Sequence, residues 1–174
     1  MINHRCRTLL ILLALIAAGE KSAAWSEAAP DSALFFADLP FAMPEIALPR
    51  IPRREVSITS FGAQGDGRTM NTTAFSRAID ACHAEGGGRV IVPAGIWLTG
   101  PIVLRDNIDL HLEKNACILF SPQLDIYPVV HTQYGGVSAF RRQSPISGWD
   151  LENIAITGPG MVDGSGQAWR PVKK

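Results

Sequence analysis

Short apolar runs alternate with turn residues along the second half of the chain. The runs are rich in Ile, Val and Leu, and Gly, Pro, Asn and Asp separate them. This pattern is typical of short β-strands. It predicts strands at residues 89–92, 96–99, 102–104, 108–112, 117–120, 154–157 and 161–164. No segment with helical periodicity separates these runs, and strand content alone leaves a sandwich, a barrel or a solenoid open.

One amphipathic helix is expected before these strands. Apolar residues recur there at spacings of three and four, which places them on one face of a helix. They are Ala74, Phe75, Ala78, Ile79 and Cys82. Thr72 or Asn71 is the expected N-cap, and the Gly-rich sequence at 85–88 is the expected stop. Residues 55–63 are interpreted as a further strand that buries Val56, Ile58 and, at its end, Phe61.

A weak internal repeat favours a solenoid. The segments that begin at Asn107 and Asn153, 46 positions apart, both read Asn-Ile, a polar or small residue and an aliphatic residue, and both continue through a turn to a second apolar run. Solenoids stack such units and need a cap where the hydrophobic cross-section is exposed. We therefore interpret the helix as a cap and the strands as coils.

The first residues have the layout of a secretory signal peptide, predicted to span 1–24. Arg5 and Arg7 precede an apolar run from Leu9 to Ala18, and small residues follow up to Ala24. That run is only about half of the ~20 residues that cross a bilayer. Residues 25–54 are Pro-rich but carry regular apolar positions, so we expect an extended arm along a hydrophobic surface rather than a disordered linker.

Charge and cysteine content exclude several classes. Loss of 1–24 removes three of 16 basic residues and one of 16 acidic residues, which leaves a net charge of about −2. Long basic runs are missing, so no nucleic-acid partner is expected, and no membrane partner after signal cleavage. Cys82 and Cys117 both lie in apolar patterns, which favours two buried thiols over a disulfide.

The glycines at 62, 65 and 67 resemble a ligand loop but match neither nucleotide-binding fingerprint. Asp66 is a single carboxylate without the alternating ligands of a calcium loop. We interpret this segment as a tight turn. No metal ligands and no cofactor-binding residues are predicted, and no cofactor is expected.

The remaining polar and aromatic candidates form no recognisable motif. The histidines are scattered, and His111 is expected to be a packed or surface strand residue. Five aspartates are expected to be solvated or turn-forming: Asp106, Asp109, Asp125, Asp150 and Asp163. Four aromatic residues are candidates for stacking on sugar rings, although filling a core is the commoner role. They are Tyr127, Tyr134, Trp149 and Trp169.

Residues 57–122 and the later segments "YPVV" and "SPISGWDLENIAITGPGMVDGSGQAW" resemble the N-terminal portion of glycoside hydrolase family 28, the polygalacturonases. The resemblance implies an all-β protein, a right-handed parallel β-helix with an N-terminal amphipathic capping helix. Residues 55–174 would then be the cap and first coils of that β-helix, truncated at the C-terminus. It further implies inverting hydrolysis of α-1,4-galacturonosyl linkages in pectic polysaccharides or oligogalacturonides, with separated carboxylates that admit a water molecule.

The family's catalytic motifs are an Asn-x-Asp, an adjacent Asp pair, a Gly-His-Gly histidine and an Arg-x-Lys. The sequence contains no Asp pair, no Gly-His and no Arg-x-Lys, and the Asn-x-Asp motif is expected to be missing as well. No catalytic residue is therefore predicted, and the chain alone is expected to be inactive. A β-helix polysaccharide lyase and a non-catalytic carbohydrate-binding β-helix are the alternatives. The full-length protein is expected to be a secreted or periplasmic monomer.

Overall fold

The computed structural model describes residues 41 and 48–173, except for the side chains of Tyr134 and of residues 171–173. The expected signal peptide and most of the expected arm lie outside the described residues. The described part contains the helix α2 (Thr72–Ala84) and eleven strands. None of its helices is long and apolar enough to span a bilayer.

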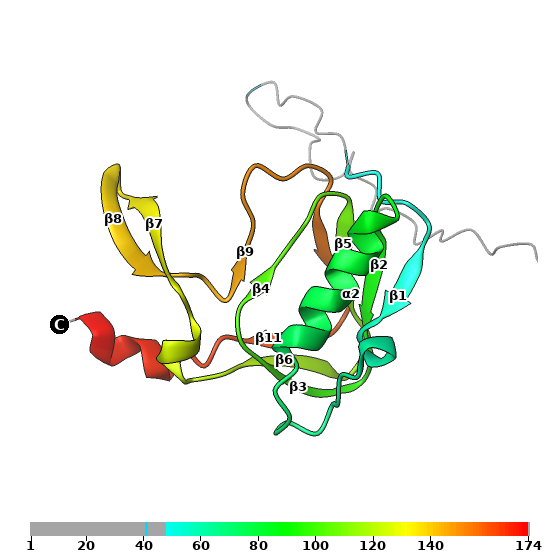
Figure 1. Ribbon diagram of the computed structural model, residues 1–174, viewed down its shortest axis with the longest axis horizontal. Coiled ribbons are helices and arrows are strands. Elements are labelled where there is room, and N and C mark those ends of the chain that lie inside the picture. Colours follow the sequence, from blue (N-terminus) through cyan, green and yellow to red (C-terminus); the bar gives the residue numbers. More distant parts are fainter. Residues whose placement is uncertain (1–40, 42–47, 174) are drawn as a thin grey trace, which may run out of the picture. The chain divides into compact units, whose positions relative to one another are not determined.

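Parallel strands dominate the structure and form three sheets (Figure 1). Sheet A contains, in spatial order, β1 (Glu55–Ser57), β2 (Gly88–Val92), β5 (Ile108–Leu112) and β10 (Ala155–Thr157). Sheet B contains β3 (Gly95–Thr99), β6 (Ala116–Phe120) and β11 (Met161–Asp163). Sheet C contains β4 (Ile102–Val103) and β9 (Ile146–Ser147).

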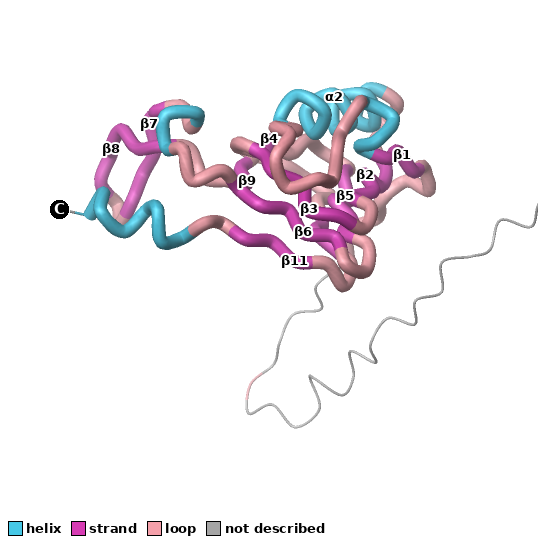
Figure 2. Tube along the Cα trace, turned by 90° about the horizontal axis from the view of Figure 1, so that it is seen from below, coloured by secondary structure: helices cyan, strands magenta, loops and turns pink. Residues whose placement is uncertain are grey.

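The chain passes from sheet A to sheet B and sheet C and then returns to sheet A. The strands β2, β3 and β4 make one coil, β5, β6 and β9 make the next, and β10 and β11 begin a third. Figure 2 shows β3, β6 and β11 side by side in this order. Each strand pairs in parallel with its counterpart one coil away. All seven predicted strands are therefore confirmed, with bounds that differ by a residue at some ends.

The internal repeat marks two successive coils. Ile108 of β5 pairs with Gly88, 20 positions earlier, whereas Ala155 of β10 pairs with Asp109, 46 positions earlier. The second coil is longer because residues 121–145 leave the stack between β6 and β9. They include η2 (Leu124–Ile126) and the antiparallel hairpin of β7 (Val129–Tyr134) and β8 (Val137–Arg142), which form sheet D. In Figures 1 and 2 this hairpin lies apart from the stacked strands.

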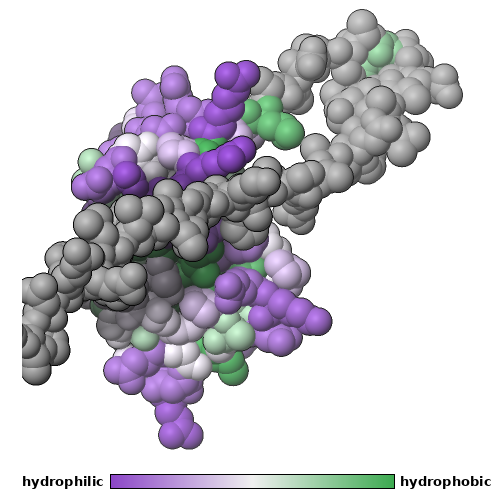
Figure 3. Space-filling model, turned by 90° about the vertical axis from the view of Figure 1, so that its right-hand side faces the viewer, coloured by the Kyte–Doolittle hydropathy of each residue, from purple (hydrophilic) through white to green (hydrophobic). Residues whose placement is uncertain are grey.

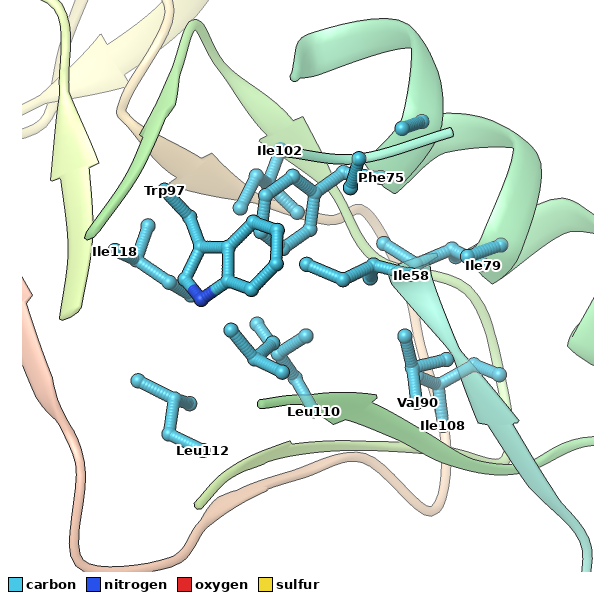
Figure 4. Close-up of a cluster of buried hydrophobic side chains, with 14 of the residues drawn as sticks. Ile58, Phe75, Ile79, Val90, Trp97, Ile102, Ile108, Leu110, Leu112 and Ile118 are labelled. Atoms are coloured by element: carbon cyan, nitrogen blue, oxygen red, sulfur yellow. The ribbon is translucent and has the colours of Figure 1, made fainter. Parts of the chain in front are cut away.

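Strand alternation places aliphatic side chains inside the coils. In β2 and β6 every second residue is buried, as expected for strands with one face toward a core. The side chains of Val90, Leu110 and Ile118 meet there with Trp97 and Phe75 (Figure 4). Hydrophilic residues cover much of the surface that Figure 3 presents, with smaller hydrophobic areas between them.

The helix α2 packs on this core through the predicted stripe. Its five predicted apolar residues are all buried, and the helix contacts β1, β2, β4 and β5. Asn71 occupies the N-cap position but makes no side-chain capping bond. The expected strand over 55–63 is wrong beyond Ser57, because Ile58–Phe61 forms the 3-10 helix η1, which ends at Gly62 in the left-handed conformation.

Candidate functional site

The outer face of sheet A carries a row of polar side chains at positions that the coil repeat brings together. Residues with odd numbers in β2 and β5 point away from the core, because those with even numbers are buried inside it. Parallel pairing aligns Arg89 with Asp109, and His111 with Thr157. We call these four residues the sheet A polar row.

Asp109 is the centre of this row and is only 2 % exposed. The Arg89 Nε donates to one carboxylate oxygen of Asp109 at 2.7 Å. The Thr157 hydroxyl donates to the other carboxylate oxygen, also at 2.7 Å. Both oxygens of this buried charge are therefore satisfied, as a buried carboxylate requires. The expectation that Asp109 is solvated or turn-forming is wrong, since the neighbouring coils supply both of its partners.

His111 extends the row in the same direction. Its Nδ1 lies 2.7 Å from the Thr157 hydroxyl oxygen. Because Thr157 gives its only proton to Asp109, the Nδ1 of His111 must carry the hydrogen of this contact. The prediction that His111 is a packed or surface strand residue is confirmed, since it lies half-buried in β5. The row thus links three coils by side-chain hydrogen bonds.

The row does not have the chemistry of a hydrolase site. Hydrolysis of a glycoside uses two carboxylates on opposite sides of the bond, and the row has one, with both oxygens already bonded. Asn107-Ile108-Asp109 has the spelling Asn-x-Asp, so the expectation that this motif is missing is wrong. Its aspartate is buried against Arg89, and its asparagine accepts a 3.1 Å hydrogen bond from Asn153 at the corresponding position of the next coil. We therefore interpret both side chains as structural residues that hydrogen-bond neighbouring coils to each other.

Three of the other predicted aspartates accept hydrogen bonds or form an ion pair, and the fourth is exposed. The carboxylate of Asp106 accepts from the Glu152 N–H, that of Asp163 accepts from the Ser165 N–H, and Asp125 pairs with Arg142 at 3.1 Å. Asp150 has a positive φ of 51° and is exposed. In residues 48–173 no cluster of three or more His, Cys, Asp and Glu residues could hold a metal ion.

The glycine-rich segment after η1 is a turn, as predicted. The carboxylate of Asp66 accepts from the backbone N–H groups of Thr69 and Arg68 and from the Thr69 hydroxyl. These bonds lower its pKa from 3.8 to about 2. Gly67 has a φ of 71°, which glycine adopts readily.

Asn71 is a structural residue whose role the sequence did not reveal. Its buried side-chain amide donates to the carbonyls of Gln64, Thr69 and Leu98, and its oxygen accepts from the Gln64 N–H. The amide thus ties the turn to β3. Its position before the helix predicted an N-cap. No local sequence pattern indicates its contact with the Leu98 carbonyl, which is 27 positions away.

The aromatic candidates divide into packed and exposed residues. Tyr127 is buried, donates to the Ser121 carbonyl, and meets the Trp169 ring edge-on at 5.0 Å. Burial also raises the pKa of Tyr127. Trp149 follows β9 and is 86 % exposed, so of the three whose side chains are described it is the one available for contact with a sugar. The side chain of Tyr134 lies outside the described residues.

Two further histidines and the two cysteines of the described part make structural contacts. His83 contacts the Asp106 carbonyl, and His131 contacts the Ser138 hydroxyl within the hairpin. Cys82 is buried, Cys117 is half-buried, and both are free thiols whose pKa values burial raises. The expectation of two buried thiols is confirmed for Cys82, whereas Cys117 is only half-buried.

The chain is similar in sequence and structure to known pectin-degrading enzymes. No family model matches the chain. An exo-poly-α-D-galacturonosidase of Dickeya chrysanthemi is 38% identical over 69% of this chain and 20% of its own length. The crystal structure of an exopolygalacturonase from Thermotoga maritima is 46% identical, with a TM-score of 0.65, over 69% of this chain and 27% of that one.

A family 28 exopolygalacturonase of Yersinia enterocolitica is 36% identical, with a TM-score of 0.59, and the match covers 65% of this chain and 21% of that one. The chain therefore spans between a fifth and somewhat over a quarter of the relatives it matches. These similarities confirm the resemblance seen in the sequence. The chain is thus homologous to a part of the polygalacturonases of glycoside hydrolase family 28.

Proposed function

We propose that this chain forms the capping helix and first coils of a right-handed parallel β-helix hydrolase that cleaves pectin. Its substrate is polygalacturonate or an oligogalacturonide, and its reaction is hydrolysis of α-1,4-galacturonosyl linkages with inversion. The observation that carries the proposal is the 46% identity and common fold with the Thermotoga maritima exopolygalacturonase over 69% of this chain.

Within this proposal the described residues are scaffold. The sheet A polar row and the Asn107–Asn153 bond hold successive coils in register. The carboxylates that protonate the leaving oxygen and activate water belong to further coils, which this chain does not supply. The N-terminal segment 1–24 exports the protein, so that it acts in the periplasm or outside the cell.

The test is the reading frame that contains this chain in its gene. We expect the frame to continue past the codon for Lys174 and to encode an Asn-x-Asp motif and an adjacent Asp pair. The protein expressed from that frame should release reducing sugar from polygalacturonate, and NMR should show the inverted anomer as the first product.

Other outcomes contradict the proposal. A stop codon directly after Lys174 would favour a non-catalytic, carbohydrate-binding β-helix. Release of an unsaturated, ultraviolet-absorbing product would show a lyase. A retained anomer would contradict inversion, because inversion requires direct attack by water on the opposite face of the sugar.

A further inference from the structure

The hairpin of β7 and β8 leaves the stacked coils but is fixed at its base (Figure 2). Arg142 donates to the Leu124 carbonyl at 2.6 Å and pairs with Asp125 at 3.1 Å. The Gln143 N–H donates to the Pro128 carbonyl at 2.8 Å. These bonds anchor the hairpin to η2 and to the segment before β7. A projection held in this way presents its side chains in a fixed arrangement, which lowers the entropic cost of binding a ligand.

The pairing of the two strands defines which side chains share a face of the hairpin. His131 lies opposite Phe140, and Gln133 lies opposite Ser138. Because side chains alternate between the two faces along a strand, these four residues lie on one face. We call His131, Gln133, Ser138 and Phe140 the hairpin aromatic face. Val137 belongs to the opposite face by the same alternation.

The hairpin aromatic face combines an exposed ring with polar groups. The Phe140 ring is 76% exposed, and its centroid lies 5.2 Å from that of the His131 ring. The His131 Nε2 lies 2.6 Å from the Ser138 hydroxyl oxygen, whereas its Nδ1 has no partner among the described residues. The Gln133 amide also has no partner among them. This combination suits a sugar ring, which has C–H groups on its faces and hydroxyl groups at its edge.

The charge of the hairpin suits an anionic ligand. Residues 126–149 contain no Asp or Glu, although the chain has 16 acidic residues in all. Asp125, just before this stretch, is paired with Arg142. Arg141 adds a further positive charge to the hairpin. A surface without carboxylates of its own does not repel a ligand that carries one carboxylate on each sugar unit.

From these features we infer that the hairpin aromatic face binds the oligogalacturonide or polygalacturonate chain. One sugar unit stacks on the Phe140 ring, and its hydroxyl groups bond the Gln133 amide and the His131 Nδ1. The face carries no carboxylate that could take part in hydrolysis, so its role is to hold the polymer. The identity of the ligand rests on the proposed function, whereas the position of the contact rests on the hairpin itself.

The test is an NMR titration of the chain without residues 1–24 with trigalacturonate. We expect the amide signals of residues 129–142 to shift, while those of β2 and β5 stay in place. Phe140→Ala should weaken binding about tenfold, or about 1.4 kcal/mol, because it removes the stacking ring. Phe140→Tyr keeps the ring and should keep the binding.

Val137→Ala is the matched control, because Val137 is 67% exposed on the opposite face of the same hairpin. It should leave the affinity unchanged. Unaltered amide signals of β2 and β5 in each variant show that the fold is intact. If the chain alone does not stay in solution, the protein expressed from the complete reading frame decides. Phe140→Ala should then raise its KM for polygalacturonate about tenfold and leave kcat unchanged.

Four results would overturn the inference. They are the absence of shifts in the hairpin, shifts confined to other strands, equal binding of the uncharged maltotriose, and an affinity or KM that Phe140→Ala does not change. Failure of the proposed function is distinguishable from these results. A complete frame that encodes no catalytic carboxylates would refute the hydrolase but leave hairpin binding in place, whereas a working hydrolase with unshifted hairpin signals would refute the inference alone.

Discussion

At the scale of single residues, the coil repeat explains why a buried charge is tolerated. Asp109 has a cation on one neighbouring coil and a hydroxyl on the other, so stacking itself provides the partners that burial requires. The ion pair of Asp80 and Arg105, at 3.0 Å, is instead exposed to solvent. The two ion pairs therefore allow a matched comparison.

We predict that Asp109→Asn lowers the free energy of unfolding by about 3 kcal/mol, because it removes the buried charge that the Arg89 Nε contacts at 2.7 Å. Asp80→Asn should cost less than about 1 kcal/mol, as is usual for exposed ion pairs. Urea denaturation of both variants measures the difference. Equal costs would show that the sheet A polar row does not stabilise the stack.

Residue roles were only partly accessible from sequence. The buried stripe of α2 follows from periodicity, and the Asp66 turn follows from its flanking glycines. The partners of Asp109 could not be predicted, since they lie 20 and 48 positions away and depend on the register between coils. The same long separation concealed the role of Asn71.

At the scale of elements, short apolar runs predicted the stacked strands well because each has one face in the core. The hairpin of β7 and β8 was missed since both of its faces are largely exposed and show no alternation. The Gly135-Gly136 pair between the two strands was the available signal, because two residues with positive φ favour a tight hairpin turn. Residues 121–145 leave the stack and lengthen the second coil. The spacing of 20 positions between β2 and β5 was therefore not visible as a repeat in the sequence.

The turn between β10 and β11 is tested by a glycine substitution. Gly158 has a φ of 93°, and a Cβ there would overlap the backbone carbonyl of Leu112. We predict that Gly158→Ala lowers the free energy of unfolding by more than about 1 kcal/mol. Gly164→Ala is the control, because a Cβ there meets no atom within 4 Å. Urea denaturation that finds the two variants equal would contradict close packing of this turn on β5.

At the scale of the whole molecule, the contacts in the described part of the chain are structural. The described residues stack three coils, bury one helix against them and hold their polar groups in structural bonds. Fold-level similarity extends over two thirds of the chain but over a minor part of each relative. The sequence could therefore reveal the similarity to polygalacturonases, whereas the placement of the catalytic residues remains part of the proposed function.

We propose that this chain can replace the corresponding first section of a polygalacturonase. The direct measurement replaces the matching segment of the Thermotoga maritima exopolygalacturonase with residues 48–173 and follows release of reducing sugar from polygalacturonate. We predict hydrolysis by the joined protein and none by this chain alone. Hydrolysis by the chain alone, or a joined protein that folds but does not hydrolyse the polymer, would contradict this proposal.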